Sequence, residues 1–292
     1  VLQRQALQAK GTAPHVLVMS ATPIPRTLTL TLYGDLDLSV LRQMPPGRVP
    51  IKTHWKRPEQ AASVYRAIAQ LLDRGRQAYV VCPLVEESDK LEAAAATQHA
   101  ERIAKEMLPG YRVGLLHGQM SPEAKEERMR AFKAGELDVL VSTTVIEVGI
   151  DVPNASVMVV EDADRFGLAQ LHQLRGRVGR GQFASYCVLI ADPRTEAGIR
   201  RLQVMTETSD GFRIAEEDLR LRGPGEYFGT RQSGIPEFRF ADLLRDEPIL
   251  IETRKAAAEL VRDDPELMRP ENRALNCEVM SRAASLSLAK VS

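Results

Sequence analysis

Three arginines and three glycines alternate in HQLRGRVGRG, residues 172–181, and these residue types suit the binding of a phosphoryl group. The guanidinium of arginine carries a permanent charge and a planar fork of donors that matches phosphate oxygens. If the stretch is helical, Arg177 and Arg180 share a face and Gln173 lies one turn before Arg177. The glycines inside such a helix would cost about 1 kcal/mol each, so we expect them to admit another backbone or a phosphate. The alternative is a plain basic surface patch.

A second stretch, VSTTVIEVGIDVPNAS at 141–156, has an apolar strand pattern that runs into a polar loop. Loops at the carboxyl ends of strands carry ligand contacts in α/β proteins. We expect one such edge to present two hydroxyls, a close-approach glycine and a carboxylate, from Thr143, Thr144, Gly149 and Asp151. The alternative is an ordinary polar loop between a strand and the next element.

The elements that must position these residues follow an α/β pattern, because short apolar runs alternate with amphipathic stretches as in a parallel sheet. The predicted strands are 15–20, 50–55, 77–83, 111–117, 137–143, 155–161 and 184–190. The predicted helices are 58–73, 91–107, 122–134, 168–178, 195–208 and 247–262. Ser121 is the expected N-cap of the helix that begins at Pro122.

The amino-acid composition excludes few classes of function. The 39 basic and 39 acidic residues cancel, so any nucleic acid must be held by local patches. The three cysteines form no CxxC pair, which argues against a metal site and a disulfide framework and suits a reducing cytosol. No apolar run reaches the roughly 18 residues of a membrane span. Because Val1 stands in what reads as the middle of a helix, we expect a fragment of a longer protein.

Three segments resemble motifs of the superfamily-two helicases: SAT at 20–22, the 141–156 stretch, and QLRGRVGR at 173–180. Such motors have two RecA-like lobes with ATP and Mg²⁺ between them. The chain contains no GxxxxGK[ST] loop and no DExx strand end. The resemblance therefore implies that most contacts to ATP and Mg²⁺ come from a first lobe that this chain lacks, and that the arginines reach toward the nucleotide across the cleft.

The resemblance also implies roles for single residues. Arg177 and Arg180 match the arginine fingers, and Gln173 matches a residue of the ATP cleft. Further matches are Gly149 and Asp151 toward the nucleotide, Ser20 and Thr22 in lobe coupling, and Thr143, Thr144, His117 and Gly118 toward the DNA. Ser20 stands where many relatives carry threonine, which keeps the hydroxyl. As a lone histidine, His117 would more often be structural.

The rest of the chain resembles the RecG family of branch-migrating DNA helicases, in 23–53, in 81–96 and in 210–234. The last segment looks like the translocation motif that this family shares with the transcription-repair coupling translocases. In that motif a helical hairpin carries ATP-driven closure to a loop on duplex DNA. The matching positions are Arg222, Gly223, Arg231 and Gln232. The alternative for this glycine-rich segment is an ordinary surface loop.

The expected fold is therefore α/β, a RecA-like parallel sheet with helices on both faces, followed by a helical hairpin, a loop and a C-terminal helix. We expect the tail of a first lobe at 1–43, a second lobe at 44–194, the hairpin and translocation loop at 195–240, and a helical tail at 241–292. The ending from Ser281 has little periodicity, which favours a frayed terminus.

The implied function of the whole protein is ATP-dependent helicase activity in DNA repair and recombination, with regression of stalled replication forks and migration of Holliday junctions. The implied partners are branched duplex DNA and single-stranded DNA-binding protein, with no membrane contact, and the implied state is a monomer in the bacterial cytoplasm at the nucleoid. Two alternatives stay open: a transcription-repair coupling translocase, and a non-catalytic docking module. By itself this chain is expected to hydrolyse no ATP, because it supplies one wall of the cleft.

Overall fold

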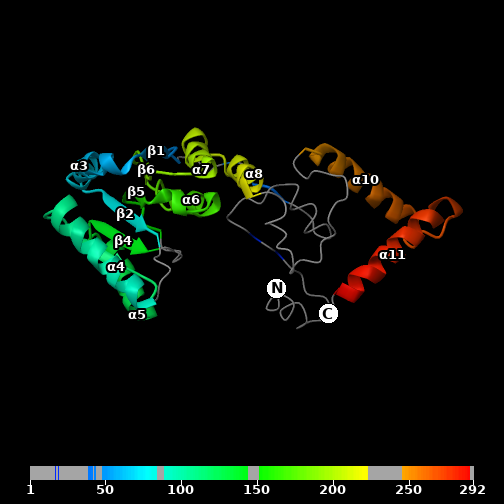
Figure 1. Ribbon diagram of the computed structural model, residues 1–292, viewed down its shortest axis with the longest axis horizontal. Coiled ribbons are helices and arrows are strands. Elements are labelled where there is room, and N and C mark those ends of the chain that lie inside the picture. The colour runs from blue at the N-terminus through cyan, green and yellow to red at the C-terminus, as the bar shows by residue number, and fades with distance from the viewer. Residues whose placement is uncertain are drawn as a thin grey trace.

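The computed structural model in Figure 1 has an α/β body and a separate pair of long helices, α10 and α11. It describes residues 17, 19, 39–41, 43, 48–83, 89–143, 151–222 and 245–289; for 89–92, 222, 247 and 282–289 it describes the backbone alone. The predicted strand at 15–20 and the predicted boundary near residue 43 lie mostly outside these residues, so both stay predictions.

The body is built on a six-stranded sheet in the order β1-β6-β5-β2-β4-β3. Every neighbouring pair of strands is parallel, which confirms the predicted sheet. The strands are β1 (Lys52–Lys56), β2 (Gln77–Cys82), β3 (Val113–Leu116), β4 (Val139–Thr143), β5 (Ala155–Glu161) and β6 (Tyr186–Ile190). The inner strands β2 and β4 are buried along their whole length, as expected for a parallel sheet that is covered on both faces.

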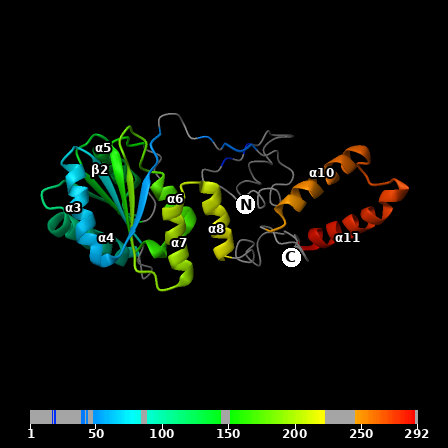
Figure 2. The same cartoon turned by 90° about the horizontal axis from the view of Figure 1, so that it is seen from above.

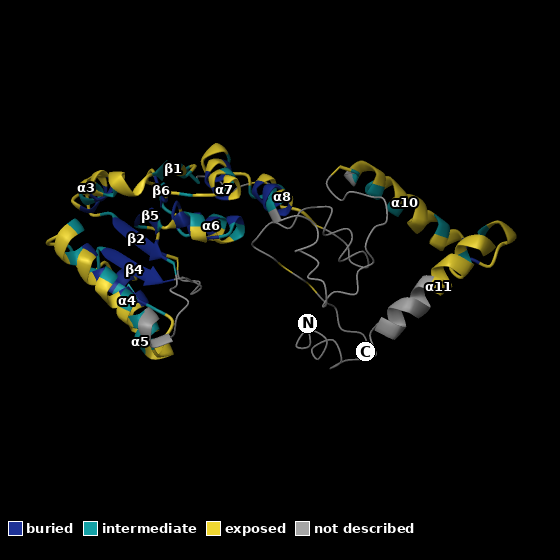
Figure 3. Ribbon diagram, viewed as in Figure 1, coloured by how far each residue is buried: buried dark blue, intermediate teal, exposed yellow. Residues whose placement is uncertain are grey.

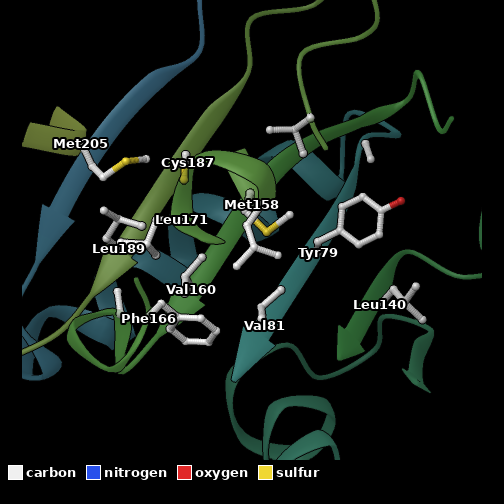
Figure 4. Packing of buried hydrophobic residues seen from close by; sticks show 14 of the residues in the cluster. Tyr79, Val81, Leu140, Met158, Val160, Phe166, Leu171, Cys187, Leu189 and Met205 are labelled. Atoms are coloured by element: carbon white, nitrogen blue, oxygen red, sulfur yellow. The ribbon is translucent and has the colours of Figure 1, made fainter. Parts of the chain in front are cut away.

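Helices cover both faces of the sheet, as predicted (Figure 2). They are α3 (Ala61–Leu72), α4 (Asp89–Arg102), α5 (Pro122–Lys133) and α6 (Leu168–Arg175), with short turns at Pro58–Gln60, Ile103–Met107 and Ala163–Arg165. Tyr65 and Ile103 pack in a cluster on one face, whereas Phe132 and Leu171 pack in a second cluster on the other. Figure 4 shows the second cluster, in which side chains of β2, β5 and β6 meet Leu171 of α6. The arrangement therefore has three layers.

Two further helices, α7 (Glu196–Glu207) and α8 (Gly211–Arg222), form a pair against α6. Arg200 of α7 lies 3.4 Å from Glu207 of its own helix and 3.4 Å from Glu217 of α8. The contact with Glu217 joins α7 to α8, as does the ion pair between Arg213 of α8 and Glu207, at 3.7 Å. The pair confirms the helical hairpin that was predicted to follow the sheet.

The last helices are α10 (Glu247–Asp263) and α11 (Arg273–Ala289), with a short turn at Pro270–Asn272 between them. Both are largely exposed where their side chains are described (Figure 3). The predicted frayed terminus from Ser281 is wrong, because α11 continues to Ala289. Alanine and leucine dominate this segment, and their high helix propensity outweighs the missing periodicity.

The turn between α10 and α11 is held by one carboxylate, that of Asp264. It accepts hydrogen bonds from the backbone N–H groups of Met268 and Arg269, at 3.0 and 2.9 Å, and from Nδ2 of Asn272 at 2.8 Å. The hydrogen bonds from Asn272 and the Arg269 backbone lower the pKa of Asp264. A charged Asp264 therefore fixes the angle of the helix pair.

Within the described residues, no helix is both long and apolar enough to cross a membrane. The same residues contain no group of three histidine, cysteine or acidic side chains placed to hold a metal ion.

Candidate functional site

Residues 176–181, the arginine loop, follow helix α6 without belonging to it. Gly179 has a φ of +74°, a left-handed conformation that glycine adopts without steric cost. The prediction that the helix reaches residue 178, with Arg177 and Arg180 on one helical face, is therefore wrong. A loop presents the two guanidinium groups instead.

The glycines of the arginine loop admit close protein neighbours. A Cβ on Gly179 would lie 2.7 Å from Cγ1 of Ile51, and a Cβ on Gly181 would collide with the carbonyl oxygen of Pro153. At Gly176 a Cβ would lie 3.3 Å from a backbone oxygen of the preceding helical turn. At Gly179 the neighbours are side chains, and at Gly176 they belong to its own helix, so neither residue admits another backbone segment as expected. Gly181 does so, and the sequence had not singled it out.

Arg180 lies beside Asp151, with 3.5 Å between Nη1 and Oδ1, so the structure brings these two predicted residues together. The Nε of Arg180 also donates a hydrogen bond to the carbonyl of Gly176, at 3.3 Å. Tyr79 of β2 is the buried neighbour of this cluster: burial raises its pKa to about 12, although the charges of Arg177 and Arg180 act in the opposite direction. Sequence reasoning missed Tyr79, since it stands inside an apolar strand.

Arg177 is half-buried, and none of the ion pairs within the described part of the chain involves it. Its backbone N–H donates to the carbonyl of Leu174, at 3.0 Å, which fixes the start of the loop on α6. Gln173 is exposed on α6 and precedes Arg177 by one turn, as predicted. The loop therefore carries one guanidinium held by a carboxylate and one that is not.

The 141–156 stretch spans two opposite edges of the sheet. Thr143 ends β4 at the carboxyl edge, whereas Asp151 lies just before β5, at the amino edge. Because β4 and β5 both run parallel to β2, the connection between them must cross the sheet. The prediction that Thr143 and Asp151 share one edge is therefore wrong, and Asp151 belongs with the arginine loop.

His117 and Gly118 lie at the same edge as Thr143. They follow β3, in which Leu116 is paired with Ser142 of β4. The carbonyl of Gly118 accepts a hydrogen bond from Nζ of Lys125, at 2.6 Å, which fixes this turn against α5. The residues expected to face DNA are thus separated from those expected to face the nucleotide.

A cleft of about 460 Å³ opens at the carboxyl edge of the sheet. Its lining includes Thr143, Cys82, Glu161, Asp162, His99 and Arg102. Asp162 directly follows β5 and has a φ of +45°, an uncommon conformation for a residue with a side chain. Apart from Thr143, no residue named in this lining was singled out as a site residue from the sequence.

Glu161 is the central charge of this cleft. Its carboxylate accepts a hydrogen bond from the hydroxyl of Tyr65 at 2.6 Å and lies 2.7 Å from Nε2 of His99. Burial acts to raise the pKa of Glu161, but the hydrogen bonds and charges of His99, Tyr65 and Arg102 outweigh it, and the pKa is lowered. A charged, fully paired carboxylate is a poor general base, so this cleft suits binding rather than proton transfer.

Several predicted site residues lie outside the described residues: Ser20, Thr22, Thr144, Gly149, Gly223, Arg231 and Gln232. For Arg222 only the backbone is described, as the end of α8.

His172 of α6 predicts a pH dependence of stability. Burial, together with the charge of Arg175, lowers its pKa from 6.5 to about 4. Between these pH values the unfolded chain binds a proton that the folded chain does not. Stability should therefore fall as pH decreases from about 6.5 to about 4, by roughly 2 to 3 kcal/mol. Urea unfolding of wild type and His172→Gln at several pH values in this range measures the effect. In the variant the free energy of unfolding should depend less on pH.

The matched control is His54→Gln, which removes an exposed histidine of β1 and should leave the pH dependence unchanged. If the free energy of unfolding of His172→Gln depends on pH as in wild type, another group causes the pH dependence.

Two family models match adjoining parts of the chain. The model described as "Helicase conserved C-terminal domain" matches residues 63–182, which include α3 to α6 and the arginine loop. The model described as "ATP-dependent DNA helicase RecG, domain 3, C-terminal" matches residues 208–290, which begin just before α8. The first match contains the four strands β2 to β5, and the second contains α8, α10 and α11.

Curated relatives and a solved structure are similar over most of the chain. ATP-dependent DNA helicase RecG of Bacillus subtilis is 48% identical over 280 residues, which cover 96% of this chain and 41% of the relative. The RecG protein of Streptococcus pneumoniae is 52% identical, over 90% of this chain and 40% of the relative. A solved structure of RecG bound to a three-way DNA junction matches with a TM-score of 0.66 and 48% identity, over 82% of this chain and 31% of that one. The chain thus spans about two fifths of the length of these two curated relatives.

Proposed function

We propose, because this chain belongs to the RecG family of ATP-dependent DNA helicases, that it forms the carboxy-terminal motor part of an ATP-driven translocase on double-stranded DNA. The observation that carries the proposal is the arginine loop. It holds Arg177 and Arg180 on one short segment beside Asp151, within the stretch that matches the helicase C-terminal model. Two clustered cations on a glycine-rich loop suit the phosphates of a nucleotide better than a neutral ligand.

The chemistry assigned to the loop is stabilisation of charge. ATP bound with Mg²⁺ supplies the phosphoanhydride bond that water cleaves, and the metal neutralises part of the phosphate charge. The guanidinium groups of Arg177 and Arg180 stabilise the negative charge on the phosphoryl group in transit. Asp151 holds Arg180 in position. Gln173 and Gly149 are assigned to the ATP cleft by resemblance alone. The described residues fit the phosphates of ATP but offer no cluster of metal ligands, so we assign most contacts to Mg²⁺ to the first lobe.

DNA binding is assigned to the carboxyl edge of the sheet. We assign contacts with the phosphate backbone to Thr143, His117 and Gly118 there, and to Thr144 by resemblance. Thr143 also lines the neighbouring cleft together with Glu161. Their backbone amides and hydroxyls suit contacts that position the protein without reading sequence. Lobe coupling and translocation are assigned by resemblance to Ser20, Thr22, Arg222, Gly223, Arg231 and Gln232.

The whole protein would regress stalled forks and migrate Holliday junctions, unwinding with three-prime to five-prime polarity as a monomer at the bacterial nucleoid. Branched duplex DNA is its proposed substrate, with single-stranded DNA-binding protein as a partner. The solved RecG complex with a three-way junction supports the substrate. This chain by itself should hydrolyse no ATP, because the arginine loop supplies one wall of the cleft.

The direct test is ATP turnover by the full-length protein with a four-way junction, a model fork and a linear duplex of equal length, at one stated salt concentration. We expect stronger stimulation by the two branched substrates, together with unwinding of the junction. Branched DNA offers phosphate contacts to several arms at once, whereas linear DNA offers only one duplex.

Equal stimulation by linear duplex, or activity only beside RNA polymerase, would instead support a transcription-coupled motor. If no DNA stimulates ATP turnover, the result would instead support a non-catalytic docking module.

A further inference from the structure

Arg175 is a buried arginine at the last position of helix α6. It is 4% exposed. None of the ion pairs within the described residues involves it. Burial lowers its pKa, which reflects the cost of removing a cation from water. A buried charge persists only where polar groups compensate it.

The partners of Arg175 are two backbone carbonyls at the end of helix α7. Its Nη1 donates hydrogen bonds to the carbonyl of Met205, at 3.0 Å, and to that of Thr208, at 2.8 Å. The carbonyls of the last helical turn have no partners within the helix and carry its negative dipole end. The carbonyl groups at the end of α7 together stabilise the charge of Arg175. The interaction therefore depends on the position of that helix end.

The backbone joins Arg175 directly to the arginine loop. The N–H of Arg177 donates to the carbonyl of Leu174 at 3.0 Å, and the N–H of Val178 donates to the carbonyl of Arg175 at 3.3 Å. A single residue, Gly176, therefore separates Arg175, whose guanidinium holds α7, from Arg177, whose guanidinium is assigned to the nucleotide. A movement of this turn changes the position of Arg177.

The helix end that Arg175 contacts belongs to a pair of helices joined by ion pairs. Arg200 of α7 lies 3.4 Å from Glu217 of α8, and Arg213 of α8 lies 3.7 Å from Glu207 of α7. Helix α8 ends at Arg222 and directly precedes, in the sequence, the segment assigned to translocation. The end of α7 therefore lies between the arginine loop, which Arg175 joins to it, and α8, which leads into the segment assigned to translocation.

We propose that Arg175 is a positioning residue that fixes the arginine loop to the end of helix α7, so that displacement of the loop during ATP hydrolysis is carried to the α7–α8 pair. The proposal rests on the proposed function, and it adds the residue that joins hydrolysis to movement. Arg175 does not touch the nucleotide in this scheme. Its loss should therefore separate the two activities rather than abolish the first.

The experiment compares Arg175→Met and Arg175→Lys with wild type in the full-length protein. Both variants keep a long unbranched side chain of good helix propensity. The readout is the number of ATP molecules hydrolysed per base pair unwound on a four-way junction, a ratio that is insensitive to the fraction of protein that has folded. Arg175→Met should raise this ratio about tenfold, a coupling of ordinary size. Arg175→Lys, which keeps the charge and one carbonyl contact, should restore part of it.

The matched control is Arg130→Met, the same substitution at an exposed arginine of α5 that lies outside the contacts joining α6, α7 and α8, and it should leave the ratio unchanged. Equal loss of hydrolysis and unwinding in Arg175→Met, with an unchanged ratio, would overturn the proposal; if that variant does not fold, a wild-type ratio in Arg175→Lys would do so. A wild-type protein without DNA-stimulated hydrolysis would instead refute the proposed function, before any variant is compared.

Discussion

Replacement of Arg177 by alanine in the full-length protein should slow ATP hydrolysis by about a thousandfold or more, the size found for arginine fingers in other phosphoryl-transfer enzymes. The reason is that Arg177 lies on the arginine loop with no carboxylate partner among the described residues, so its charge is available to the phosphates. DNA binding should persist, because the residues assigned to DNA lie at the other edge of the sheet. Single-turnover hydrolysis with saturating junction DNA measures the effect.

Arg130→Ala is the matched control for Arg177→Ala. Arg130 is an exposed arginine of α5 whose partner is Glu126, one turn earlier at 3.0 Å. Its loss should change stability by only a few tenths of a kcal/mol and leave turnover unchanged. Turnover within tenfold of wild type in Arg177→Ala would mean that the loop does not act on the transferred phosphate.

Substitution of Gly181 by alanine should lower the turnover number by on the order of a hundredfold, the cost of misplacing a catalytic group by about 1 Å. The new Cβ would collide with the carbonyl of Pro153. Because the Cβ is fixed to the backbone of residue 181 and the carbonyl belongs to the backbone of Pro153, no side-chain rotation can relieve the collision. The loop must therefore shift, which separates Arg180 from Asp151. Turnover at saturating ATP, corrected for folded protein, measures the effect.

Gly135→Ala is the control for backbone strain alone. Gly135 has a φ of +76° and no atom within 4 Å of a built Cβ, far from the arginine loop in the sequence. This variant should lose about 1 to 2 kcal/mol of stability through its left-handed conformation and keep its turnover per folded molecule. Wild-type turnover in Gly181→Ala would show that the loop tolerates the shift.

The sheet and most helices could be predicted because local sequence determines them. Continuous apolar runs such as QAYVVC in β2 indicate strands buried on both faces. Ser121 caps α5 as predicted, by accepting a hydrogen bond from the Ala124 N–H at 3.2 Å. Neither signal depends on residues far away in the chain.

The details of the site depend on distant contacts, which is why the sequence missed them. The arginine loop takes a left-handed conformation at Gly179, where Ile51 approaches it, and the two residues are far apart in the chain. Glu161 meets Tyr65 across 96 positions, and the carbonyls that hold Arg175 come from another helix. Asp151 was placed at the wrong edge because the parallel direction of β4 and β5 had not been applied to the loop between them.

The order of strands also affects how the lobe can be synthesised. β1 is the first strand of the sheet in the chain, but its neighbour is β6, the last, and the Trp55 indole donates to the Ala191 carbonyl 136 positions later. A ribosome adding about 5 to 20 residues per second needs roughly 7 to 30 seconds to supply that neighbour. During this interval β1 has no partner in the sheet and exposes Trp55 to chaperones or to other nascent chains. Translation that stops before β6 therefore leaves β1 unpaired and makes β5 an edge strand, and both can pair with other chains.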